Sequence, residues 1–147
     1  MSEKRTIPND ILLGEVTSLL AGGQEVVIMT KGNSMLPLLR SEKDSVALRK
    51  KDDVEVGDIV LAYLGGGRYV LHRIIAIEGE NITLMGDGNV QGTEKCHKTD
   101  ISGTVVRILR PSGKEAVPGK GRFWRAIKPL RRYILGIYRR VIKLFGK

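Results

Sequence analysis

Short runs of β-branched and apolar residues, separated by turns rich in glycine, occupy most of the chain. The runs cover residues 26–30, 45–48, 59–64, 69–77, 82–85 and 101–109. No stretch with helical spacing separates one run from the next, so successive strands lack the crossover helices that parallel pairing needs. Gly65–Gly67 lies between two of the runs and permits the positive φ of a tight hairpin. The pattern therefore predicts a mainly β, antiparallel domain.

Helical spacing of apolar residues appears at the two ends of the chain. Residues 11–20 carry five apolar residues at such spacing, with Asn9 or Asp10 as the N-cap and Gly22 as the end signal. Residues 124–145 show a second apolar stripe, with Arg and Lys at the other positions. We therefore expect a β domain over residues 1–110, a Pro/Gly/Lys-rich linker over 111–122 and a basic amphipathic helix over 123–147.

The net charge of +9 is concentrated in this last segment. Residues 120–147 hold ten Lys or Arg and no Asp or Glu, out of 25 basic and 16 acidic residues in the chain. The remaining residues hold fifteen basic and sixteen acidic side chains, a net charge of −1. The basic pI thus describes the C-terminal segment and says little about partners of the β domain.

Other features of the composition bear on the compartment. The single cysteine, Cys96, excludes an internal disulfide and is typical of a reducing environment. The first sixteen residues lack the apolar core of a signal peptide, and no apolar stretch reaches the roughly 18 residues of a membrane span. We therefore expect a cytoplasmic protein without a transmembrane anchor.

A serine follows the first strand-like run, in the sequence GNSMLPLLR at residues 32–40. A serine hydroxyl is a weak nucleophile near neutral pH and needs a base, which in turn needs a partner that fixes its tautomer. For Ser34 the candidate bases are His72, in the apolar run YVLHRIIAI, and His97, in the polar stretch EKCHKTD. The candidate acids near strand ends are Asp87 and Glu94.

Each of these residues taken alone has a more ordinary interpretation. A serine in a turn, a histidine in a strand and an aspartate between two glycines are usually structural. Cys96 and His97 are adjacent, but no second pair with metal-ligand spacing accompanies them, which argues against a zinc site. We therefore expect no metal and no cofactor, and we look to the combination of residues for function.

In its order along the chain the combination resembles the signal peptidase and LexA-like superfamily of serine peptidases. The resemblance rests on GNSMLP around Ser34, GDIV at residues 57–60, the pair His72-Arg73 and GDGN around Asp87, and it covers about residues 26–109. It implies a coiled, barrel-like antiparallel sheet. Lysine precedes the arginine in the LexA-type and bacterial leader peptidases, whereas histidine does so in the archaeal and endoplasmic-reticulum signal peptidases. His72 therefore makes the chain similar to the histidine-type branch.

The resemblance also implies roles for individual residues. Ser34 is the expected nucleophile, His72 the general base and acid, and Asp87 the group that orients His72, with Glu94 as the alternative acid. The backbone N–H of Ser34 is an expected oxyanion donor. Bacterial leader peptidases often supply a second donor from a serine two residues before the nucleophile, where this chain has Gly32. Asn33 is a further candidate for that second donor.

The implied function is a serine endopeptidase that cleaves a peptide or precursor protein by acyl transfer. Extended substrates bound by strand addition belong to that implication. The alternative is a non-catalytic peptide-binding module of the same fold, tethered to a membrane by its basic tail. The bond between Ala21 and Gly22 resembles the Ala-Gly bond at which LexA-type proteins cut themselves, although a glycine helix cap explains it better.

For the segment Trp124–Lys147 the favoured partner is an anionic membrane surface. A basic amphipathic helix with aromatic residues can lie in such an interface, which would place the protein on the inner face of the membrane. Docking of this helix on the β domain or on a partner protein is the next interpretation. Nucleic acid ranks last, because phosphate binding requires no apolar stripe and the body is nearly neutral.

Overall fold

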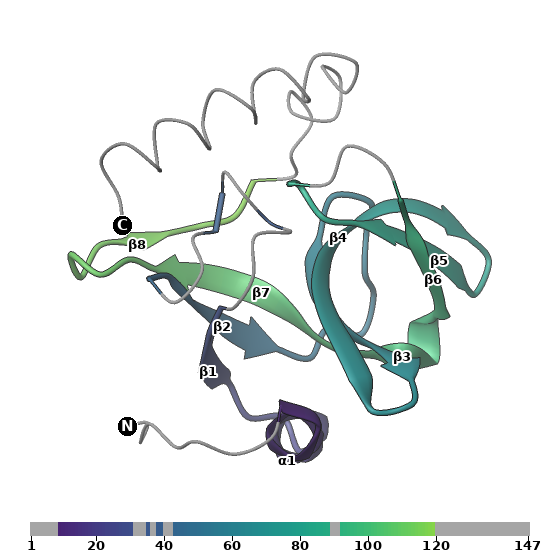
Figure 1. Ribbon diagram of the computed structural model, residues 1–147, viewed down its shortest axis with the longest axis horizontal. Coiled ribbons are helices and arrows are strands. Elements are labelled where there is room, and N and C mark those ends of the chain that lie inside the picture. The colour runs from purple at the N-terminus through teal and green to yellow at the C-terminus, as the bar shows by residue number, and fades with distance from the viewer. Residues whose placement is uncertain (1–8, 31–34, 36–37, 40–42, 89–91, 120–147) are drawn as a thin grey trace.

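The computed structural model of the protein describes residues 9–30, 35, 38–39, 43–88 and 92–119. One helix, α1, precedes the sheet, and a short 3₁₀ helix, η1, lies within it. Figure 1 shows their arrangement. The bounds are α1 (Asn9–Ala21), β1 (Val26–Met29), β2 (Ser45–Arg49), β3 (Ile59–Gly65), β4 (Arg68–Glu78), β5 (Asn81–Met85), β6 (Glu94–His97), η1 (Lys98–Asp100), β7 (Ile101–Leu109) and β8 (Glu115–Ala116).

The strands form one antiparallel sheet in the order β1-β2-β7-β3-β4-β5-β6, with β8 paired to β7. Strands β3 to β6 curl around one another, whereas β1, β2, β7 and β8 extend to the other side of the molecule (Figure 1). The pairing register shifts at four places, between Ala47 and Leu48 among others, and such irregularities increase local twist. The prediction of a mainly β, coiled and barrel-like antiparallel fold is confirmed.

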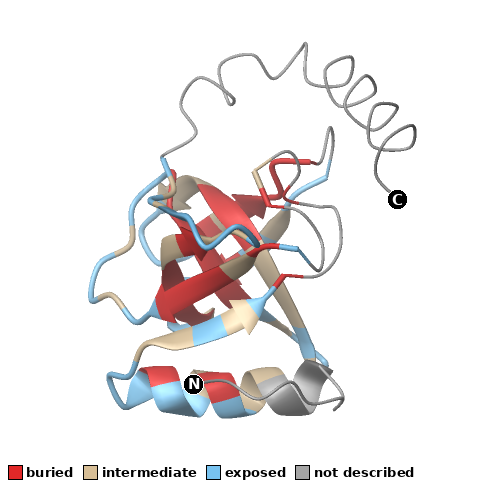
Figure 2. Cartoon of the chain, turned by 90° about the vertical axis from the view of Figure 1, so that its left-hand side faces the viewer, coloured by how far each residue is buried: buried red, intermediate tan, exposed pale blue. Residues whose placement is uncertain are grey.

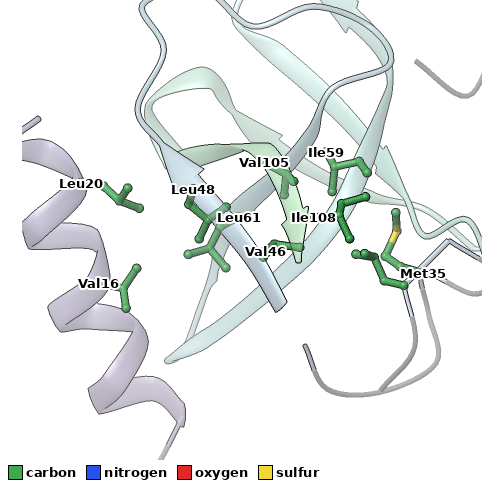
Figure 3. Packing of buried hydrophobic residues seen from close by; sticks show 10 residues of the cluster. Val16, Leu20, Met35, Val46, Leu48, Ile59, Leu61, Val105 and Ile108 are labelled. Atoms are coloured by element: carbon green, nitrogen blue, oxygen red, sulfur yellow. The ribbon is translucent and has the colours of Figure 1, made fainter. Parts of the chain in front are cut away.

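The hydrophobic core divides into two clusters, because side chains alternate between the two faces of a strand. The first lies where α1 covers β2, β3 and β7, and Figure 3 shows Val16 and Leu20 of the helix directed toward these strands. The same helix runs along one side of the sheet in Figure 2. The second cluster fills the curl of β3 to β6 and consists of Val60, Ala62, Ile74, Ile82, Leu84, Cys96 and Ile101.

Close approach of α1 to the sheet depends on Gly103 in β7. A Cβ atom at this position would lie 2.9 Å from Cδ1 of Leu20, which is fully buried. A side chain there would therefore push the helix away from the strand. The glycine allows the first cluster to close.

The C-terminal end of α1 is capped by its own backbone. The amide of Gly22 donates to the carbonyls of Ser18 and Leu19, and Gly23, with a φ of 89°, donates to Leu20. The bond between Ala21 and Gly22 is thus part of a hydrogen-bonded helix end. This arrangement agrees with the interpretation of Gly22 as a cap, and it does not present the bond in an extended form.

Two short strands were not foreseen. The polar stretch around His97 was expected to be a loop, but Glu94–His97 pairs with β5 as strand β6 and buries Cys96. Glu115 and Ala116, inside the expected linker, pair with β7 as β8. Both are stabilised by backbone pairing with a neighbour that is distant in the sequence, and their own composition gives no strand signal.

The expected C-terminal helix over residues 123–147 lies outside the described residues, so that helix and the domain boundaries remain predictions. Within the described part of the chain, no helix is both long enough and apolar enough to cross a bilayer.

Candidate active site

His72 and Glu94 meet within the curl of β4, β5 and β6. Nδ1 of His72 lies 2.7 Å from Oε1 of Glu94, and the exposed fractions of the two side chains are 6% and 18%. The sheet register explains this contact. Glu94 lies opposite Leu84 of β5, and Leu84 lies opposite Ile74 of β4, so all three share one face with His72, two residues before Ile74. The histidine and the glutamate are therefore diagonal neighbours across three strands.

The geometry assigns the protons of the imidazole ring. An ionised carboxylate only accepts hydrogen bonds, so Nδ1 of His72 is the donor toward Glu94. In a neutral imidazole the other nitrogen, Nε2, then keeps its lone pair. Nε2 can accept a proton from a hydroxyl group, which is the property that a general base requires.

Arg73, the next residue of β4, forms a second buried ion pair with Asp87. Its Nε donates to Oδ1 of Asp87 at 2.8 Å, and its Nη2 donates to Oδ2 at 2.6 Å. Nη1 donates to the carbonyls of Gly57 and Gly119 at 2.9 and 2.7 Å. This two-pronged contact with full use of the guanidinium satisfies a charge that would otherwise be expensive to bury.

The two acids that the sequence left open therefore have different contacts. Glu94 is the carboxylate at Nδ1 of His72, whereas the Asp87 carboxylate binds Arg73 through both of its oxygens. The preferred expectation, that Asp87 orients His72, finds no contact among the described side chains, while the alternative acid has one. Consecutive residues of a strand point to opposite faces, so His72 and Arg73 cannot readily share one acid.

Ser34 and Asn33 lie outside the described residues, and their roles remain predictions. Met35, which follows Ser34, is buried in the first core cluster, and its Sδ accepts a hydrogen bond from the amide of Asp87 at 3.3 Å. The residue next to the expected nucleophile thus lies beside the turn that carries the Arg73 partner. Figure 3 shows Met35 next to Ile108, at the opposite end of the cluster from α1.

Sequence reasoning did not give Arg73 a role of its own. The signal was present, since an arginine within an apolar strand is almost never buried unless it is paired. What the sequence could not show was the choice of partner. A buried Arg73 required an acid, and the tertiary structure assigns Asp87 to it.

Cys96 and His97 of β6 do not combine into a site. Burial, followed by the negative charge of Asp100, raises the pKa of the Cys96 thiol from 9.0 to about 11. The side chain of His97 is on the exposed side of the strand, and its amide donates to Asp100. No group of three or more potential metal ligands occurs among the residues that the structure describes.

Comparison with known proteins supports the resemblance noted from the motifs. No curated protein matches the chain. A protein-family model described as Peptidase S24-like matches residues 4–106, more than half of the chain, and this range includes Ser34, His72, Asp87 and Glu94. The family is part of the LexA and signal peptidase-like superfamily. The chain therefore belongs to the Peptidase S24-like family.

Proposed function

We propose that the protein is a serine endopeptidase in which Ser34 is the nucleophile, His72 the general base and acid, and Glu94 the acid that orients His72. Membership of a peptidase family supports the class of reaction. The observation that carries the assignment is the 2.7 Å contact between Nδ1 of His72 and Oε1 of Glu94. It supplies a base with its tautomer fixed, which is what a serine hydroxyl lacks.

The proposed reaction is acyl transfer in two steps. Oγ of Ser34 attacks the scissile carbonyl while Nε2 of His72 accepts the hydroxyl proton, and His72 then returns this proton to the leaving amine. Water attacks the resulting ester, with His72 again as base, and Ser34 is released. Glu94 stabilises the imidazolium that forms in each step. The backbone N–H of Ser34, with Asn33 as a second candidate, binds the oxyanion.

The base places the protein in the histidine-type branch of the superfamily within this proposal. A lysine base must lose its charge through desolvation before it can accept a proton, and it needs no carboxylate partner for that purpose. An imidazole gains from a carboxylate that fixes its orientation. The position of Glu94 at Nδ1 of His72 therefore favours histidine as the working base.

Strand β1 offers the edge along which an extended substrate could add. It stands at one end of the sheet order, and its chain direction leads toward Ser34. Val27 and Met29 are 38% and 45% exposed, so this strand presents apolar side chains as well as its backbone edge. Main-chain pairing with β1 would hold a peptide or a precursor segment in extended form beside the nucleophile.

A fluorophosphonate probe, which forms a bond to an activated serine, tests the proposal. We expect labelling of the wild-type protein, no labelling of Ser34→Ala, and a strong loss with His72→Ala. His97→Ala is the matched control, because it removes the other histidine without touching the His72–Glu94 pair. Labelling that persists in Ser34→Ala would end the assignment. Peptide binding without any labelling would instead favour the non-catalytic binding module.

A further inference from the structure

The loop that carries Ser34 connects β1 to β2, and its two ends are joined to each other. Thr30 lies at the start of the loop and Asp44 at its end. The amide and Oγ1 of Thr30 both donate to the carbonyl oxygen of Asp44, at 3.0 and 2.8 Å. This closure fixes the base of the loop.

Arg110 contacts the same loop from a different part of the sheet. Strand β7 pairs with β2 so that Leu109 lies opposite Ser45, which places Arg110 next to Asp44. Nη1 of Arg110 donates to Oδ2 of Asp44 at 2.9 Å and to the carbonyl oxygen of Leu38 at 2.8 Å. Asp44 is fully buried, so its negative charge depends on such partners.

Leu38 belongs to the limb of the loop that follows Ser34. The amide of Leu39 donates to the carbonyl of Met35 at 2.9 Å, and both side chains are buried in the first core cluster. One guanidinium nitrogen therefore ties this limb to the end of the loop. The hydrogen bond from Asp87 to Sδ of Met35 holds the limb on its other side.

We propose that Arg110 is a positioning residue of the peptidase reaction, acting through Leu38 and Asp44 on the loop that presents Ser34. The inference rests on the proposed function, to which it adds a residue outside the Ser34, His72 and Glu94 set. Nucleophilic attack requires close alignment of the reacting atoms, and a displacement of about 1 Å can reduce the rate by about 100-fold. Arg110 prevents such a displacement and takes no part in proton transfer.

The test compares Arg110→Ala and Arg110→Lys with Arg107→Ala. Arg107 lies on the same strand and pairs with Glu25 and Glu115 on the surface, so its removal takes away an arginine without touching the loop. A further variant combines Arg110→Ala with Asp44→Asn, which avoids an unpaired buried charge if the single variant does not fold. The readouts are the inactivation constants with the fluorophosphonate probe and hydrogen exchange of amides in residues 35–44.

We expect Arg110→Ala, or the double variant, to lower the maximal inactivation rate by about 10-fold to 100-fold. The probe concentration at half-saturation and the pH midpoint of inactivation should stay unchanged, because His72 and Glu94 are untouched. Exchange in residues 35–44 should increase, Arg110→Lys should recover part of the rate, and Arg107→Ala should match the wild type. A purely structural role would lower thermal stability while leaving the inactivation rate of the folded protein intact.

Two results would overturn the inference in different ways. Wild-type inactivation rates in folded Arg110→Ala or in the double variant would remove the role of Arg110 and leave the peptidase assignment standing. Absence of labelling in the wild-type protein would remove the peptidase assignment, and the inference would fall with it.

Discussion

Nδ1 of His72 lies 2.7 Å from Oε1 of Glu94, across three strands of a curled sheet. The following residue, Arg73, points to the opposite face of β4 and binds Asp87 there. Two adjacent residues thus each meet a carboxylate, on opposite faces of the sheet. This separation assigns a different task to each acid: Glu94 acts on the proposed base, and Asp87 holds the framework.

Replacement of Glu94 by Gln tests the first task. The amide has nearly the same shape but no charge to stabilise the imidazolium, and it can favour the wrong tautomer of His72. We expect the probe-labelling rate to fall by roughly 10²- to 10⁴-fold, while urea unfolding stays close to that of the wild type. A labelling rate equal to that of the wild type would show that Glu94 is not the orienting acid.

Replacement of Asp87 by Ala tests the second task. The buried Arg73 guanidinium would lose its bidentate partner, and removal of one member of a buried ion pair costs about 3–5 kcal/mol of unfolding free energy. We therefore expect a large loss of stability in urea unfolding, in contrast to Glu94→Gln. Full stability combined with loss of labelling would instead return Asp87 to the role of orienting acid.

Thr104 on β7 allows a stability test with an opposite control. Its Oγ1 is buried without a hydrogen-bond partner among the described residues, and the residue is 3% exposed. Thr104→Val removes this unsatisfied hydroxyl with little change in shape, so we expect the unfolding free energy to rise by about 1 kcal/mol. Thr30→Val removes a buried hydrogen bond to Asp44 and should lower it by about 1 kcal/mol. Loss of stability in Thr104→Val would show that its hydroxyl is satisfied.

Cys96 gives a prediction about pH. Its folded-state pKa of about 11 lies above the ordinary value of 9.0, so the neutral thiol contributes its full stability below pH 9.0, and this contribution is lost as the pH rises toward about 11. We expect slow reaction with a disulfide reagent at about pH 8 in the folded protein and rapid reaction after unfolding, because only the thiolate reacts. Wild type should also lose more stability than Cys96→Ala across that pH window. Rapid reaction of the folded protein at about pH 8 would contradict the raised pKa.

For the basic segment Trp124–Lys147 we propose an anionic membrane surface as the partner. Each Lys or Arg near such a surface contributes roughly 1 kcal/mol. We expect the full chain to co-sediment with vesicles of anionic lipid, less so in high salt and little with neutral lipid, and a chain ending at Gly119 to remain in solution. Equal pelleting of both forms would remove this proposal. Retention on nucleic acid but not on vesicles would favour the alternative partner.

The sequence alone determined the fold class and most of the strand positions. Residues 26–29, 59–64 and 101–109 announce themselves because β-branched and apolar residues there are bounded by glycine turns. Strand β6 did not, since its backbone pairs with β5 while three of its four residues are polar or charged. Local composition reports how a segment is buried, and β6 is held mainly by its neighbour.

For the candidate site, the sequence supplied the residues, and the order of Ser34, His72 and Asp87 supplied the family. It could not decide between Asp87 and Glu94, because the distance along the chain from His72 does not reveal which face of the sheet an acid occupies. Strand register settled the contacts: Glu94 lies on the face of His72, and Asp87 meets Arg73. The link from Arg110 to Leu38, 72 residues apart, likewise exists only because β7 pairs with β2. Side-chain chemistry is written in the sequence, whereas the partners of each side chain are set by the pairing of distant strands.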